Sequence, residues 1–91
     1  MPAAAPSAPF SAEALATALI AGESQLPADL DDTRRTALAW ALKDAALACW
    51  STNQAQVATV EGWLRQLLAL DRSTPTSPIP ALHDWVAALA A

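Results

Sequence analysis

The residues of this sequence that could carry out chemistry are few and widely spaced. Its one histidine, His83, stands beside Asp84, and such a pair can orient an imidazole as a general base. No serine or cysteine stands at a spacing that marks it as the nucleophile for that base. We therefore expect His83 to be a polar residue on the exposed side of a helix, and we predict that the protein is not an enzyme.

A cluster of aspartates, Asp29, Asp31 and Asp32, offers oxygen ligands of the kind that calcium prefers. A calcium-binding loop that began at Asp29 would need a glycine at its sixth position and a glutamate at its twelfth. The sequence has Arg34 and Trp40 there. We predict no metal site, and we assign the carboxylates to the first turn of a helix, where they meet the positive end of the helix dipole.

The remaining reactive side chains also have structural interpretations. Arg34 and Arg35 could hold an anionic group, but the neighbouring aspartates are closer partners, and we expect ion pairs. Cys49 is the one cysteine, so no intrachain disulfide can form; a buried thiol acts as a small hydrophobe. This cysteine usage fits a reducing compartment, and we expect a cytoplasmic protein. With two glycines in the chain, neither a phosphate loop nor a dinucleotide fingerprint can be built, and no cofactor is predicted.

Acyl carrier proteins are acidic four-helix domains of similar size, and they carry a prosthetic group on a serine that follows an aspartate at the start of their second helix. The stretch LDDTRRTALAWAL has Thr33 after Asp32 at about that place, and no glycine precedes the pair. The attachment serine is therefore replaced, so the sequence does not indicate an acyl carrier.

The charge of the chain argues against two classes of partner. Five basic residues face nine acidic ones, and the net charge is −4. Binding to nucleic acid needs a basic stripe that displaces counterions from phosphates, so we predict no nucleic-acid binding. An anionic membrane surface is disfavoured for the same reason.

The sequence shows no pattern of a membrane or secretory segment. No apolar run approaches the ~20 residues of a membrane span, and MPAAAPSAPF lacks the basic and apolar regions of a secretory signal.

The hydrophobic content of 54% is dominated by alanine, which supplies 24 of the 49 residues counted; thirteen leucines and four tryptophans provide one small core. Charged residues make up 15%, against roughly 25% in an average globular domain. A small domain has much surface for its volume. Either much of this surface is small and neutral, or a partner covers part of it.

Local signals predict an all-α fold: a small four-helix, bundle-like domain over residues 10–91, after a disordered Ala/Pro-rich tail over residues 1–9. Ser11 is a good N-cap and Gly22 a good left-handed C-cap, so the first helix should span about 12–21. The second should begin between 28 and 32 and end near Trp50. The third should follow capping boxes at Ser51 and Asn53 and run to about 70. The fourth should follow Ser77 and run to about 90. No stretch alternates as a strand would.

The second predicted helix raises the main question. One face of this helix carries Leu38, Leu42, Ala45 and Cys49. The opposite side carries Trp40 and Leu47, with Trp50 nearby. Between the two lies a seam of smaller residues and one leucine: Leu30, Ala37, Ala41 and Ala48. A helix that is apolar all round is a buried helix, so this helix should be central and packed on at least two sides. Either the other helices cover it completely, or a second chain or a ligand covers the tryptophan side.

The other helices have simpler faces. The third carries a core stripe of Val57, Val60, Leu64, Leu67 and Leu68, with Trp63 and Leu70 at its edge and a smooth reverse of Ala55, Ala58, Gly62 and Ala69. The fourth carries a stripe of Leu82, Trp85, Val86 and Leu89.

From these patterns we predict a bacterial protein-interaction module, such as an adaptor, a chaperone-like protein or a regulatory subunit, that could form a homodimer through its second helix. The candidate interface residues are Trp40, Leu47, Trp50 and Trp63. The alternative function is a carrier of an apolar small molecule in a tryptophan-lined pocket between helices.

Overall fold

A computed structural model describes residues 11–27, 30–70 and 77–90. Four helices make up this part of the chain: α1 (Ala12–Ala21), α2 (Asp32–Cys49), α3 (Gln54–Leu70) and α4 (Ile79–Ala90). The all-α prediction is confirmed, and the described residues contain no strand. The predicted tail over residues 1–9 lies outside the described residues.

Side-chain caps begin all four helices, as their sequences predict. Ser11, Asp31, Asn53 and Ser77 each accept a backbone N–H of the following turn, at 3.2, 2.8, 3.1 and 3.1 Å respectively. Gly22 ends α1 with a φ of 77°, a left-handed conformation in which a Cβ would be strained. These caps satisfy backbone groups that have no partner inside the helix, which explains why the boundaries could be predicted closely.

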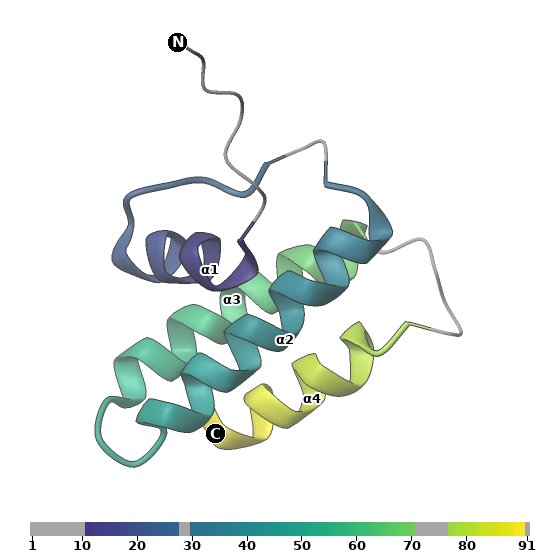
Figure 1. Ribbon diagram of the computed structural model, residues 1–91. Coiled ribbons are helices and arrows are strands. Elements are labelled where there is room, and N and C mark those ends of the chain that lie inside the picture. Colours follow the sequence, from purple (N-terminus) through teal and green to yellow (C-terminus); the bar gives the residue numbers. More distant parts are fainter. Residues whose placement is uncertain (1–10, 28–29, 71–76, 91) are drawn as a thin grey trace, which may run out of the picture.

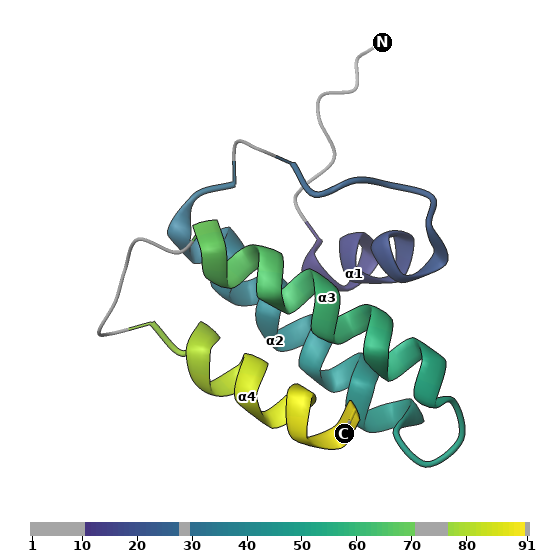
Figure 2. The same cartoon turned by 180° about the vertical axis from the view of Figure 1, so that it is seen from behind.

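The helices α2 and α3 form a central pair, with α1 on one side of it and α4 on the other (Figures 1 and 2). The helix α2 contacts all three of the others. The prediction that the second helix is packed on at least two sides is confirmed, but α3 also contacts all three of the others, so α2 shares the centre of the fold with α3. The arrangement also means that α2 is covered from three directions and keeps one outward side.

The core forms where the four helices meet. Leucine and valine side chains of α3 supply its centre, and Val57, Val60, Leu64 and Leu67 are all fully buried, as their spacing predicts. The members contributed by the other helices and by the α1–α2 connection are Ala16, Leu19, Leu30, Leu38, Ala39, Leu42, Ala46, Cys49, Ile79, Leu82 and Val86.

The buried face of α2 is turned relative to the predicted stripe. Leu38, Leu42 and Cys49 are buried as expected, but Ala45 is only half-buried. Ala39, Ala46 and Lys43 are buried in addition. The reason is that α4 packs beside α3 on α2 and covers the side that carries these three residues. Two alanines of the predicted seam, Ala37 and Ala48, are exposed on the outward side of α2.

The predicted stripe of α4 was wrong at one position. Leu82 and Val86 are buried and Leu89 is half-buried, but the side chain of Trp85 is 48% exposed. Trp85 lies at the edge of the stripe, where α4 meets α2, so its ring lies across the junction of the two helices instead of inside the core. Ile79, one turn before Leu82, occupies the core in its place.

Candidate functional site

Two of the tryptophans predicted on the outward side of α2 are half-exposed. The exposed fraction is 45% for Trp40 and 49% for Trp50, which is the C-cap residue of α2. Leu47 is half-buried and stands one heptad after Trp40, so these two side chains lie in one row along the helix. Exposed aromatic side chains of this size are uncommon in a small domain, and their position in one region marks this side of α2 for attention.

A third tryptophan joins them from α4. The Nζ of Lys43 lies 4.9 Å from the ring centroid of Trp40 and 5.1 Å from that of Trp85. Both distances are within the range of a cation–π contact. One ammonium group therefore connects an aromatic ring of α2 with one of α4. We call the surface formed by Trp40, Lys43, Leu47, Trp50 and Trp85 the tryptophan face.

Lys43 has a buried side chain although it carries a charge. Its residue is only 8% exposed, and its Nζ also lies 2.7 Å from Oδ1 of Asp44. Burial of an ammonium is unfavourable unless the charge is compensated, and here two aromatic rings and one carboxylate compensate it. Lys43 thus contacts both Trp40 and Trp85, and its positive charge is paired with the negative charge of Asp44.

Sequence reasoning did not assign Lys43 and Trp85 to this surface. Trp85 was placed in the core stripe of α4, and Lys43 was given no role. One signal was available: Lys43 stands three residues after Trp40, a spacing that puts the two side chains next to each other on the helix surface. The partner helix that supplies the second ring could not be read from spacing alone.

Trp63, the fourth predicted interface residue, lies elsewhere. It is half-buried, and its indole Nε1 donates a hydrogen bond to the backbone oxygen of Leu19 at 3.2 Å. This bond joins α3 to α1, on the opposite side of the central pair from α4 (Figure 1). The structure therefore brings Trp40 together with Trp85 through Lys43 and does not bring Trp63 to the same surface.

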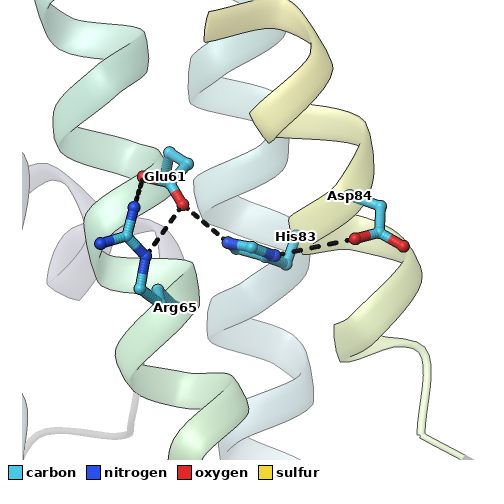
Figure 3. Close-up of polar contacts among 4 residues, drawn as sticks. All are labelled: Glu61, Arg65, His83 and Asp84. Atoms are coloured by element: carbon cyan, nitrogen blue, oxygen red, sulfur yellow. Dashed lines mark hydrogen bonds and ion pairs between the residues drawn. The ribbon is translucent and has the colours of Figure 1, made fainter. Parts of the chain in front are cut away.

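A polar cluster joins α3 to α4 (Figure 3). Oε2 of Glu61 lies 2.7 Å from Nε2 of His83, and its Oε1 accepts a 2.5 Å hydrogen bond from Nη2 of Arg65. Nδ1 of His83 faces Oδ1 of Asp84 at 3.9 Å. The prediction that His83 is exposed was wrong, because its side chain is only 17% exposed and is directed toward α3.

The charged neighbours of Glu61 favour its ionised form. The hydrogen bond from Arg65 lowers the pKa of the Glu61 carboxyl, burial opposes this effect, and the hydrogen bond with His83 lowers the pKa again. An ionised Glu61 therefore holds Arg65 on its own helix and His83 on the next one. These contacts hold the side chains of α3 and α4 together.

The remaining charged candidates lie at the start of α2. Arg35 forms the predicted ion pair with Asp32 and donates from Nη1 to the backbone oxygen of Leu30 at 2.5 Å.

Cys49, at the end of α2, is buried, as predicted, and its thiol lies 3.7 Å from the backbone oxygen of Ala46. Within residues 11–27, 30–70 and 77–90, no three His, Cys, Asp or Glu side chains gather as a metal ion would require.

Two adjoining grooves lie beside α1. One, of about 190 Å³, is lined by Glu13, Ala16, Thr17, Ala41, Asp44 and Ala45. The other, of about 330 Å³, is lined by Thr17, Ile20, Ala21, Ala45 and Gln56. Small side chains dominate both linings and neither contains a tryptophan.

No helix among the described residues is long and apolar enough to cross a membrane. Comparisons of the chain with protein-family models, with curated proteins and with solved structures give no match.

Proposed function

We propose that this chain is a small helical protein-interaction module and that the tryptophan face is its binding surface. The observation that carries the proposal is that two half-exposed tryptophans from different helices, Trp40 of α2 and Trp85 of α4, contact one ammonium group, that of Lys43. Tryptophan is enriched among the residues that dominate binding energy in protein interfaces. Trp50, the C-cap residue of α2, adds a third half-exposed tryptophan to the same helix.

The contacts within this surface support the same proposal. Lys43 contacts the rings of Trp40 and Trp85 and is itself held by Asp44. Binding is more favourable when the contacting side chains are ordered before the partner arrives, because less conformational entropy is lost. The low charge of the chain, at 15%, also fits a surface that is partly covered in an assembly.

The alternative function, transport of an apolar small molecule in a tryptophan-lined pocket, has less support. The two grooves beside α1 are lined by small side chains and no tryptophan. The proposed module acts by binding and not by catalysis, as an adaptor, a chaperone-like protein or a regulatory subunit. Its single cysteine, Cys49, supports a cytoplasmic location.

Selection from a displayed library of short helical peptides tests this function. The immobilised full chain should enrich peptides whose binding is lost in the double variant Trp40→Ala, Trp85→Ala. Leu70→Ala is the matched control, because Leu70 is 41% exposed but lies at the end of α3, outside the tryptophan face. Circular dichroism should show equal helix content in all three proteins. Peptides that bind the double variant as well as the original chain would contradict the proposal.

A further inference from the structure

We propose that the partner of the tryptophan face is a basic amphipathic helix of another protein, whose arginine or lysine side chains pair with the carboxylates beside the tryptophans. This inference rests on the proposed function and adds the chemistry of the partner. The exposed charges of α2 and α4, and their positions around the rings of Trp40 and Trp85, support it.

The exposed charges of α2 and α4 around the tryptophans are negative. Lys43 and Asp44 are the charged residues in the second half of α2. The Asp44 side chain is 70% exposed, whereas that of Lys43 is only 10% exposed. On α4, the charged side chain that reaches the surface is Asp84, which is 86% exposed, because that of His83 is only 17% exposed. A partner therefore meets an acidic surface, although one ammonium group lies beneath it.

One carboxylate lies on each side of the two rings that contact Lys43. Asp44 stands four residues after Trp40 and is exposed with it on the outward side of α2. It also lines the groove beside α1, so it lies at the α1 side of the face. Asp84 precedes Trp85 on α4, and its side chain is directed away from α3 (Figure 3). This order, with apolar rings between two carboxylates, fits a helix that has an apolar stripe flanked by basic residues.

A single arginine of the partner can reach both Asp84 and the ring of Trp85. At about 100° per residue, Ala81 and Ala88 point between the directions of Asp84 and Trp85 on α4, and both alanines are exposed. Within α4, no long side chain therefore separates the carboxylate from the ring. A guanidinium can donate two hydrogen bonds to a carboxylate and can also stack on an aromatic ring. A neutral partner would cover Asp84 without compensating its charge, which is unfavourable.

Asp84 should contribute more to this recognition than Asp44. Oδ1 of Asp44 lies 2.7 Å from Nζ of Lys43, so its charge is already compensated in part. The contact of Asp84 with Nδ1 of His83, at 3.9 Å, is longer than a hydrogen bond. The net charge of −4 attracts a basic helix from a distance wherever it binds, so a local role of Asp84 has to be separated from that general attraction.

Fluorescence anisotropy of three fluorescein-labelled peptides with the full chain is the central experiment. The peptides are helices of about 18 residues with the same apolar stripe. The positions that flank the stripe carry arginine in the first peptide, glutamine in the second and glutamate in the third. We expect the arginine peptide to bind at least about fivefold more tightly than the glutamine peptide, and the glutamate peptide to bind most weakly.

Three variants locate the binding. Asp84→Asn should weaken binding of the arginine peptide about three- to fivefold and leave the glutamine peptide unchanged. Glu23→Gln is the matched control, because it removes the same charge at an exposed position after α1, outside the face. It should change the affinity of the arginine peptide less than about 1.5-fold, since distant exposed charges are screened by salt. Trp85→Ala should weaken binding of both peptides at least about tenfold.

The possible outcomes separate the two proposals. Binding of the arginine peptide that depends on Asp84 and not on Glu23 supports the basic partner. Equal weakening by Asp84→Asn and Glu23→Gln overturns it, because the attraction would then come from the net charge of the chain. A glutamine peptide that binds as tightly as the arginine peptide, and that Trp85→Ala releases, overturns the basic partner and leaves the proposed function intact.

Two further results also overturn the basic partner. If the arginine peptide does not bind, or binds equally to Trp85→Ala, the tryptophan face is not its site, and the peptide selection then decides the proposed function independently. If the chain alone sediments as a dimer that Trp85→Ala dissociates, the face belongs to a second copy of the chain.

Discussion

Nε2 of His83 and Oε2 of Glu61 lie 2.7 Å apart and join α4 to α3 across 22 positions of the chain. The contact is formed by two side chains that are both at least four-fifths buried. It is a polar contact between α3 and α4, and α4 also meets α2, where Trp85 lies next to Lys43. The stability of this junction should therefore depend on the charge of Glu61.

Glu61→Gln should remove part of the acid sensitivity of the fold. Folding lowers the pKa of the Glu61 carboxyl below its ordinary value of 4.5, chiefly through the hydrogen bond from Arg65. The resulting stability is complete above pH 4.5 and is lost as the pH falls through the lower folded pKa. Urea denaturation at several pH values should show the original chain more stable than the variant at pH 7, with the difference shrinking below about pH 4.5.

Asp84→Asn is the control for this comparison, because Asp84 is 86% exposed and only approaches His83 at 3.9 Å. The stability of the Asp84→Asn variant should change with pH in the same way as that of the original chain. If the Glu61→Gln variant loses as much stability at low pH as the original chain does, then protonation of Glu61 is not what weakens the junction of α3 and α4 in acid.

Lys43→Met should destabilise the domain by about 1–2 kcal/mol, because it keeps the apolar stem but removes two cation–π contacts of about 0.5–1 kcal/mol each. Chemical denaturation measures the loss, and tryptophan fluorescence should change because two rings lose their neighbour. Asp44→Asn separates the ion pair from the ring contacts. Since the Asp44 side chain is 70% exposed, the Asp44→Asn substitution should alter the free energy of unfolding by no more than about 0.5 kcal/mol. A larger effect of Asp44→Asn than of Lys43→Met would assign the stabilisation to the ion pair.

Leu64→Ala should lower the free energy of unfolding by about 2–5 kcal/mol, since Leu64 is fully buried at the centre of the α3 stripe and its truncation leaves a cavity. Leu70→Ala makes the same chemical change at a residue that is 41% exposed, and it should alter stability by only about 0.5 kcal/mol. The two variants can be compared by thermal or chemical unfolding, with circular dichroism as the signal. Equal losses at the two positions would mean that α3 presents a different face to the core.

Gly62→Ala should stabilise the domain by about 0.5–1 kcal/mol, because glycine in a helix interior is unfavourable relative to alanine by that amount. A Cβ built at Gly62 meets no atom within 4 Å, so no clash offsets the gain. Gly22→Ala is the opposite control: space is open there too, but the φ of 77° should make alanine destabilising by about 1 kcal/mol. A loss of stability in Gly62→Ala would show that another backbone approaches α3 at this position.

The four helices and their ends could be predicted from local signals in the sequence. Ser11, Gly22 and Asp31 act through bonds to backbone groups two to four residues away, so their effect can be read without knowing the fold. The stripe of α3 was also predictable, because five large apolar residues on one face of a helix leave one favourable way to bury it. These signals are local in the chain and do not depend on which helix packs where.

Which sides of α2 and α4 are covered depends on how the four helices pack together. The stripes of both helices were wide enough to be buried in more than one orientation, and the choice depended on where α1 and α4 pack against the central pair. That choice buried Lys43, left Trp85 half-exposed and turned His83 toward Glu61. It also placed Trp63 against Leu19, 44 positions away. Contacts between residues so far apart in the chain have no local signature, because they form only when separate helices meet.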